Sequence, residues 1–282
     1  MDETYTIIDR SKNSLSLNDW CVLVRLCVRK SWLRPKWGKL EELWAILDSN
    51  TEKKLIAFLL RRYIILDAEK ERTYYEEIAE YIKPNWVTPE PSKTWIVATC
   101  NDKEADGSHV VVDSIKSKFS RVLRKDNILN SYQYLEGKLQ TGDTIILCDD
   151  FIGSGWTINN RVTKIKEWIS ESKLENIDFK VISLAAMKFS KELYLDACTS
   201  ESYSCMWLNK GISDNCKSHI ATKHKETMQK IETKLSPSYY DYKLKRYSLG
   251  YKQSETLYTR KDMNIPNNVF PVFWWAKLSN GD

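Results

Sequence analysis

The spacing of apolar residues divides the chain into a helical first part and a later part that contains strands. Before residue 90, apolar side chains recur at intervals of three and four, as at Tyr74, Ile78 and Tyr81, and this spacing lines one face of a helix. Four helices are predicted, over residues 15–28, 40–47, 51–66 and 69–82. Three prolines within residues 83–91 interrupt regular structure, so this stretch is predicted to be a linker.

Continuous apolar runs begin after the linker and predict buried strands. The predicted strands are residues 95–99, 144–148, 179–186 and 205–208. Helices are predicted at 109–123, at 218–235, and after the second strand, where the apolar face is Ile158, Val162, Ile165 and Ile169. Alternating strands and helices imply an α/β fold with a doubly wound parallel sheet. The expected domains are an all-helical N-terminal region, residues 1–90, and an α/β domain, residues 91–282.

Composition and charge leave the class of ligand open. With 42% hydrophobic and 29% charged residues, the chain has the composition of a folded globular protein. The net charge of +5 suits an anionic ligand without demanding nucleic acid. The longest apolar stretch, residues 55–66, is broken by Arg61 and Arg62, so we expect no membrane span. A polar N-terminus without a signal peptide, and seven cysteines without a CxxC pair, predict a cytoplasmic protein.

Two other clusters were considered as binding sites. Cysteines and histidines between residues 198 and 224 have spacings that fit no standard zinc pattern, so we expect no zinc. Within residues 25–39, basic side chains alternate with Trp32 and Trp37. Such a patch suits contacts to the phosphates and bases of nucleic acid, and it equally suits a solvated helix face with packed tryptophans. Both interpretations of the N-terminal region stay open.

The segment with the clearest chemistry follows the second predicted strand. Asp149 and Asp150 come directly after that strand, at the edge where open α/β sheets bind ligands. The loop that follows leads straight into a helix and consists of Gly153, Ser154, Gly155, Trp156 and Thr157. Glycines let backbone N–H groups approach an anion closely, and the helix N-terminus adds partial positive charge. The loop is therefore predicted to bind a phosphate group.

The paired aspartates suit the other end of a sugar phosphate. Carboxylates accept hydrogen bonds from ribose hydroxyls, directly or through a hydrated Mg²⁺ ion. We therefore expect Asp149 and Asp150 to bind ribose and to be the Mg²⁺ ligands, directly or through water. A Walker B strand also ends in two acidic residues, but the chain contains neither GxxxxGKS nor GxxxxGKT, which argues against an ATPase.

Residues 145–157 resemble the 5-phosphoribosyl-1-pyrophosphate (PRPP) motif of type I phosphoribosyltransferases. That motif is an apolar run, two acidic residues, two apolar residues and a loop rich in glycine and hydroxyl side chains. The resemblance implies a phosphoribosyltransferase fold over roughly residues 93–210, with PRPP or a 5′-nucleotide as ligand and Mg²⁺ as cofactor. It also implies a pyrophosphate loop and a base-contacting lysine that acts with the aspartates in catalysis. The matching residues are Asp106, Gly107 and Ser108 for the loop and Lys188 for the lysine.

The chain departs from the transferase pattern at two positions. Gly153 stands where purine transferases carry an acidic residue that is often treated as the general base. Without it, proton transfer to or from a purine lacks its usual agent. Trp156 replaces a small or basic residue of the loop, so its ring either stacks on a ligand or caps the pocket. These departures weaken the case for a transferase reaction more than the case for the pocket.

A narrower resemblance rests on three ordered segments, residues 149–155, 210–214 and 265–274. They are similar to segments of the PRTase-like conflict-effector family (PRTase-CE), whose members are predicted in bacterial antiphage defence systems, including some retron operons. The resemblance implies an antiviral effector that acts at the ribose anomeric carbon, by base transfer or by cleavage of a nucleotide's glycosidic bond. Its N-terminal helices would contact a reverse transcriptase, RNA or DNA, or another defence protein. The alternative is a catalytically inactive module that senses nucleotides or serves as a scaffold.

Overall fold

The computed structural model describes residues 15–102 and 106–276. The chain divides into two compact units. One unit consists of residues 67–209, and the other combines the described parts of residues 1–66 and 210–282. This division differs from the expected boundary at residue 90. The helix before the predicted linker packs on the sheet, and the C-terminal segment packs on the N-terminal helices.

The first unit contains a five-stranded sheet in the order β3-β2-β4-β5-β6, and every neighbouring pair is parallel. Its strands are β2 (Thr94–Ala98), β3 (Ile128–Leu129), β4 (Thr144–Ile152), β5 (Asp178–Met187) and β6 (Glu201–Leu208). Each residue of β2 is buried, as expected for a strand that is covered on both faces. The predicted doubly wound parallel sheet is therefore confirmed.

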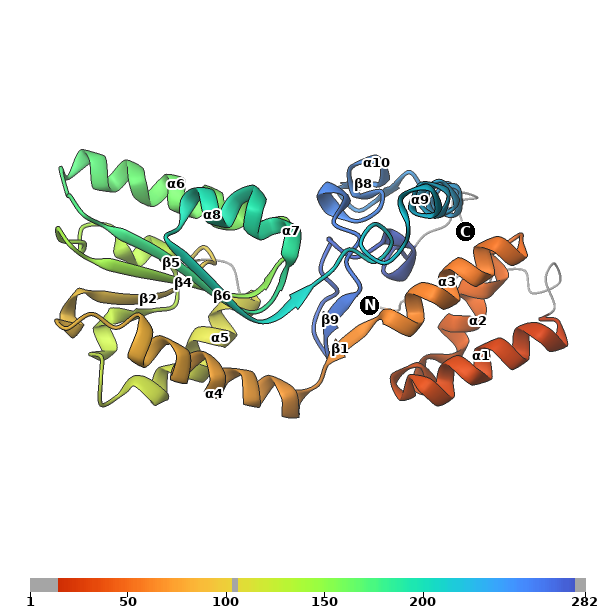
Figure 1. The fold of residues 1–282 in the computed structure, drawn as a ribbon, viewed down its shortest axis with the longest axis horizontal. Coiled ribbons are helices and arrows are strands. Elements are labelled where there is room, and N and C mark those ends of the chain that lie inside the picture. Colours follow the sequence, from red (N-terminus) through yellow and green to blue (C-terminus); the bar gives the residue numbers. More distant parts are fainter. Residues whose placement is uncertain (1–14, 103–105, 277–282) are drawn as a thin grey trace. The chain divides into compact units, whose positions relative to one another are not determined.

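Helices cover both faces of this sheet (Figure 1). Helix α6 (Trp156–Glu171) lies on one face, where Ile158, Val162 and Ile165 pack against the strands as the sequence pattern predicts. Helices α4 (Ala68–Asn85) and α5 (Gly107–Lys116) lie on the other face. A short irregular connection follows β5 and consists of α7 (Lys188–Ser190), a π-helix (Lys191–Leu195) and α8 (Asp196–Cys198).

Helix α4 packs on the sheet, although the sequence pattern groups it with the N-terminal helices that precede it. The ring of Tyr81 stacks on Tyr203 of β6 with 3.9 Å between the centroids. Its hydroxyl donates a hydrogen bond of 2.7 Å to Glu201. At 18 residues α4 is the longest described helix, and neither it nor any other helix within residues 15–102 and 106–276 has the length and apolar character needed to span a membrane.

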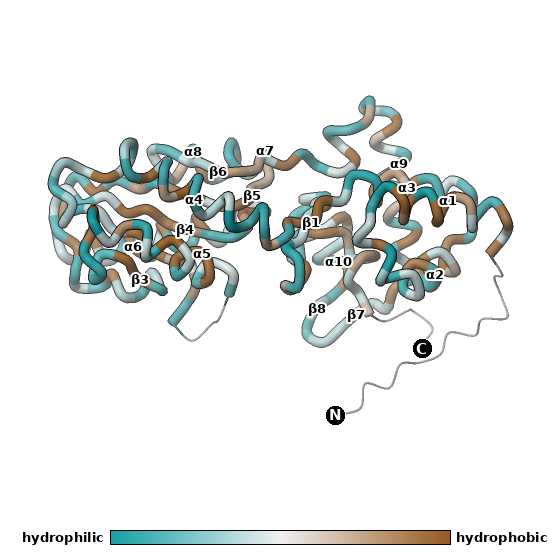
Figure 2. Tube along the Cα trace, turned by 90° about the horizontal axis from the view of Figure 1, so that it is seen from below, coloured by the Kyte–Doolittle hydropathy of each residue, from teal (hydrophilic) through white to brown (hydrophobic). Residues whose placement is uncertain are grey.

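The second unit is mainly helical. It contains α1 (Leu17–Arg29), α2 (Trp37–Ala45), α3 (Asn50–Arg62), α9 (Ser218–Glu232) and α10 (Leu244–Tyr247). The predicted helix at residues 51–66 ends early, because β1 (Ile64–Leu66) pairs in parallel with β9 (Tyr258–Arg260). A short hairpin of β7 (Ser238–Tyr239) and β8 (Tyr242–Lys243) precedes α10. Apolar positions alternate with polar ones along α1 and α3 (Figure 2), and buried side chains of α1, α3 and α9 share one core with the C-terminal segment.

A buried carboxylate at the end of α9 gives this unit a pH-dependent stability. Glu232 accepts hydrogen bonds from Ser248 Oγ at 2.6 Å and from the Leu249 N–H at 3.0 Å. Burial nevertheless raises its pKa from the ordinary 4.5 to about 7. Between these two values the folded state holds a proton that the unfolded state has lost, so stability falls as the pH rises. We expect a fall of about 3 kcal/mol from this one group.

Urea unfolding at pH 5 and pH 8 measures this effect. Glu232→Gln keeps one acceptor oxygen for the Leu249 N–H, its amide N–H can donate to Ser248 Oγ, and it does not titrate. The variant is therefore expected to lose less stability than the wild type between the two pH values. An identical loss in both proteins would show that Glu232 does not titrate as its burial implies.

Candidate functional site

The candidate site lies where the strand order of the sheet reverses. From β2 the chain crosses to β3 on one side, whereas from β4 it continues to β5 and β6 on the other. Loops that leave β2 and β4 therefore diverge, and ligands of open α/β sheets bind in the crevice between such loops. The residues predicted to form the site follow these two strands, with Asp106 after β2 and Asp149 on β4.

The acidic pair belongs to the strand itself. The predicted strand at residues 144–148 continues through both aspartates to Ile152, and Asp149 is paired with Ser183 of β5. Asp149 is only 8% exposed, and its Oδ1 accepts a hydrogen bond of 2.9 Å from the Asp150 N–H. Burial and the charges of Asp150 and Asp106 raise the pKa of Asp149 well above its usual range. A cation or a proton is therefore favoured at this point.

The loop after β2 contacts the acidic pair through Gly107. Helix α5 begins at Gly107, two residues before the start predicted from sequence, and Asp106 caps it by accepting a 2.9 Å hydrogen bond from the Ser108 N–H. The Asp150 carboxylate lies so close to Gly107 that a Cβ atom there would overlap it. The structure thus brings Asp106 and Gly107 together with the aspartates of β4. Residues 103–105 of the same loop lie outside the described residues.

The glycine loop forms the N-terminus of the 16-residue helix α6. Gly155 has a φ of +83° and is the N-cap residue, and no side chain caps the helix through it. A left-handed φ favours glycine, and a Cβ atom at Gly155 would also lie 3.0 Å from Cβ of Tyr194. The first N–H groups of a helix have no partner within the helix. The Trp156 N–H donates to Ser154 Oγ at 3.4 Å, and the positive end of the helix dipole at this loop favours an anion.

The other residues of the loop differ in exposure. Ser154 is buried, while Thr157 is exposed. Trp156 is 41% exposed and makes an edge contact with Tyr194 at 6.1 Å between ring centroids. Gly153 is buried and carries no acidic group, so the loop has no carboxylate at the position that the transferase pattern would use as a base.

Lys188 lies at the same edge of the sheet but follows a different strand. It follows β5 directly, as the first residue of α7, and its side chain is exposed. Since β5 is the neighbour of β4, Lys188 stands one strand away from the acidic pair. The structure brings the loop of residues 106–108 against Asp150, and the segment that begins at Lys188 against the glycine loop, where Ser190 Cβ lies 3.5 Å from the position of a Cβ atom at Gly155.

Sequence reasoning missed three side chains that shape the site. Arg161 of α6 donates a hydrogen bond of 2.9 Å from Nε to the Thr99 carbonyl at the end of β2. Its guanidinium also lies 4.6 Å from the ring centroid of Tyr132. Tyr194 lies against Gly155 from the π-helix after β5. An arginine in a helix and a tyrosine in a polar connection carry no distinguishing pattern, so only their positions in the fold reveal these roles.

No group of three or more metal-ligating side chains that could hold an ion occurs among the described residues. Cys216 Sγ and His224 Nδ1 lie 3.6 Å apart, without a third ligand in the part of the chain that the structure describes. Asp149 and Asp150 provide hard oxygen ligands of the kind that Mg²⁺ prefers. They suit an ion that takes its remaining ligands from water or from a bound phosphate.

Comparison with known families agrees with this geometry. The model of the PRTase-CE family matches residues 47–280. The chain belongs to the PRTase-CE family. This confirms the resemblance seen in the three sequence segments, and it makes the protein phosphoribosyltransferase-like in fold, with an N-terminal helical region in addition. No curated protein matches the chain in sequence.

Solved structures overlap this PRTase-CE protein only in part. A hypoxanthine-guanine-xanthine phosphoribosyltransferase has 14% identity and a TM-score of 0.33, over 49% of this chain and 73% of its own. UMP synthase from Leishmania donovani has 13% identity and a TM-score of 0.32, and the match covers 56% of this chain and 33% of that structure's chain. A hypothetical protein from Neisseria gonorrhoeae, solved with bound ppGpp, has 9% identity and a TM-score of 0.32, and the match covers 60% of this chain and 98% of that chain.

Proposed function

We propose that this PRTase-CE protein binds PRPP or a 5′-nucleotide and acts at the anomeric carbon of the ribose. One arrangement of residues supports the proposal. At the reversal point of the sheet, the acidic pair on β4, of which Asp149 is buried and Asp150 partly exposed, is followed within the same segment by the N-terminus of α6. A sugar phosphate carries hydroxyls at one end and an anion at the other, so it suits both halves of this site.

The phosphate of the ligand binds at residues 153–157. The αL conformation of Gly155 starts the helix, and the Trp156 N–H donates to Ser154 Oγ at 3.4 Å. The positive end of the helix dipole favours an anion beside this loop. Ser154 and Thr157 add hydroxyl donors. The exposed ring of Trp156 stands at the edge of the loop and stacks on the ligand or covers it.

The ribose hydroxyls bind the carboxylates of Asp149 and Asp150. Asp149 and Asp150 would hold Mg²⁺ together with the diphosphate of the ligand, since the described residues contain no group of three or more possible ligands. The ion would supply positive charge that neutralises the phosphates next to the aspartates. The pyrophosphate loop, Asp106 to Ser108, closes this end of the site, and Lys188 contacts the base from the neighbouring strand.

The reaction breaks the bond between the anomeric carbon and its leaving group. Positive charge develops on the ribose as the bond breaks, and the nearby carboxylates stabilise it. Attack by a base completes a transfer, and attack by water completes the cleavage of a nucleotide. Because Gly153 supplies no general base, the reaction that fits best is one whose leaving group or nucleophile needs little proton transfer from the protein.

We propose that the reaction serves antiphage defence, as the family's predicted gene context suggests, and that α1 docks a partner such as a reverse transcriptase. Four large apolar side chains on one stripe of α1 are exposed, namely Leu17, Trp20, Val24 and Val28. Exposed apolar stripes of this kind mark protein interaction sites. RNA or DNA is the second candidate partner, since Arg25 and Arg29 lie on the same helix.

One experiment tests the enzymatic proposal. The purified chain is incubated with PRPP, NAD or nucleotides and Mg²⁺, and the release of free base or pyrophosphate is measured. Asp149→Asn/Asp150→Asn is expected to abolish turnover, because it removes the charges that stabilise the ribose cation. Asp126→Asn/Asp196→Asn removes the same charge from exposed positions of the same unit and is expected to leave turnover unchanged.

The outcomes separate the candidate functions. Turnover in the wild type that the double variant loses supports an enzyme. Tight nucleotide binding without turnover supports the sensor. Absence of binding, with and without a reverse transcriptase and its RNA, would reject both and leave a scaffold.

A further inference from the structure

A second candidate site is a pocket in the helical unit, and it shares no residue with the proposed nucleotide site. It has a volume of about 480 Å³. It is lined by Gln229 of α9, by Lys245 and Arg246 of α10, and by the segment that follows α10. Ser248, Tyr251, Lys252 and Gln253 complete the lining. The pocket therefore has three basic side chains and no acidic one in its wall.

Two of the three basic side chains lie near one aromatic ring. The Arg246 guanidinium lies 5.3 Å and the Lys252 ammonium 5.9 Å from the ring centroid of Tyr251. Arg246 also donates a hydrogen bond of 3.4 Å to the Tyr251 hydroxyl. Neither Lys245 nor Arg246 forms an ion pair with a carboxylate of the described residues. Like charges held close together repel, and a bound anion removes that repulsion.

The backbone that carries these side chains is strained. Positive φ angles occur at Leu249, Lys252, Gln253 and Glu255, with values of 59°, 56°, 52° and 49°. Gly250 is also left-handed, at 81°. Side chains other than glycine rarely adopt this region, and runs of such residues persist only where the surrounding structure holds them in place. Strain of this kind clusters at ligand sites.

Two segments hold the strained loop, and both belong to the stretches that identified the family. The buried Glu255 carboxylate accepts hydrogen bonds from the N–H groups of Ile212 at 2.8 Å and Ser213 at 2.7 Å. On the other side, the Ser254 hydroxyl donates a 2.7 Å bond to the Asn268 carbonyl. Residues 212–213 and Asn268 therefore brace the loop that forms part of this pocket. The pocket is preorganised rather than an incidental gap.

We propose that this pocket binds a small ligand with two or more adjacent phosphate groups, such as a nucleoside polyphosphate. The phosphates contact Lys245, Arg246 and Lys252, and the amides of Gln229 and Gln253 contact the uncharged part of the ligand. A volume of about 480 Å³ lies within the range of small-molecule pockets. A pocket lined by only seven residues, from α9, α10 and one loop, suits a compact ligand better than a nucleic-acid strand, which needs an extended groove.

The test uses the full chain and inorganic tripolyphosphate as the probe. Binding is measured by titration calorimetry, and hydrogen exchange by mass spectrometry reports which segment is protected. Protection is expected in residues 244–256. Lys245→Gln/Arg246→Gln/Lys252→Gln is expected to weaken binding at this site by roughly 100-fold, since charge-assisted hydrogen bonds are lost, and to remove the protection.

A matched control separates the pocket from net charge. Lys39→Gln/Lys217→Gln/Lys223→Gln removes three exposed positive charges from the same unit and is expected to leave both readouts unchanged. Protection confined to residues 149–157, or equal weakening by both triple variants, would overturn the proposal. A single-stranded oligonucleotide that protects residues 244–256 when tripolyphosphate does not would assign the pocket to nucleic acid instead. Each of these outcomes is independent of turnover at the Asp149 site.

Discussion

Gly107→Ala is expected to weaken nucleotide binding by roughly 10- to 100-fold while leaving the fold intact. The added Cβ atom overlaps the carboxylate of Asp150, so that carboxylate must move away from the ligand. Loss of one charge-assisted hydrogen bond costs about 1.5–3 kcal/mol, which sets the expected range. The substitution changes no charge and lies in the first turn of α5, where alanine favours the helix. Calorimetric titration with PRPP or a 5′-nucleotide measures the effect.

Gly38→Ala is the matched control for this prediction. Gly38 lies within α2 (Trp37–Ala45), and a Cβ atom there meets nothing within 4 Å. The same chemical change is therefore expected to leave nucleotide binding unaltered and to add up to about 1 kcal/mol of helix stability. If Gly107→Ala bound nucleotides as tightly as the wild type, the contact between α5 and Asp150 would have no part in the site.

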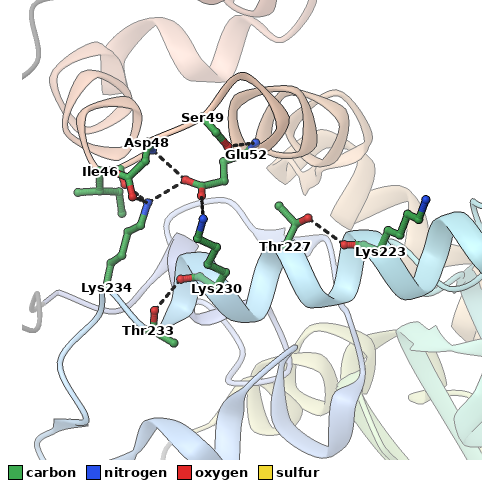
Figure 3. Close-up of polar contacts among 9 residues, drawn as sticks. All are labelled: Ile46, Asp48, Ser49, Glu52, Lys223, Thr227, Lys230, Thr233 and Lys234. Atoms are coloured by element: carbon green, nitrogen blue, oxygen red, sulfur yellow. Dashed lines mark hydrogen bonds and ion pairs between the residues drawn. The ribbon is translucent and has the colours of Figure 1, made fainter.

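Lys234→Met is expected to destabilise the helical unit by about 3–5 kcal/mol. Lys234 Nζ lies 2.8 Å from Oε2 of Glu52 and 2.8 Å from Oδ2 of Asp48, and it donates a bond of 2.6 Å to the Ile46 carbonyl. Figure 3 shows this contact between the end of α9 and the start of α3. Glu52 is only 1% exposed. Removal of Lys234 takes away its nearest cation and leaves it the Asp48 N–H at 2.9 Å and Lys230 at 3.7 Å, and the loss of one partner of a buried charge is strongly destabilising.

Urea unfolding measures this loss, and the fall in melting temperature is expected to be on the order of 10 °C. Lys230→Met is the control on the same stretch of chain, because Lys230 is 69% exposed and its Nζ lies 3.7 Å from Oε1 of Glu52. Its loss is expected to cost less than about 1 kcal/mol. Glu52→Leu/Lys234→Met removes both charges and is expected to recover part of the stability. Equal losses for both lysine variants would contradict the assigned role of Lys234.

The two predictions probe different units of the protein. Gly107→Ala tests the geometry of the proposed nucleotide site in residues 67–209, and Lys234→Met tests what holds the N-terminal helices to the C-terminal segment. The contact between Lys234 and Glu52 matters for function because the C-terminal segment contains the residues of the basic pocket. A protein that keeps nucleotide binding at Asp149 but loses tripolyphosphate binding after Lys234→Met would show that the helical unit supports the second pocket.

Much of the sheet unit was predictable from the chain. The apolar runs near residues 95, 145 and 180 form strands that are buried on both faces. Such strands consist of consecutive apolar residues, so the local sequence reveals them. The start of β6 was predicted four residues late, because its first half is only partly buried and mixes polar with apolar residues. The acidic pair and glycine loop were found because a phosphate site needs residue types that stand close together in sequence.

The sequence by itself predicted the parallel α/β sheet, the family and the segment proposed as the phosphate loop, since each of them shows as a pattern of residues close together along the chain. Tertiary structure alone decided that α4 packs on the sheet, that Gly107 touches Asp150, and that residues 210–276 pack on the N-terminal helices. Amphipathic helices show which face they bury but not what covers it. For the same reason the basic pocket, built from residues of α9, α10 and a strained loop, has no signature that a linear pattern reveals.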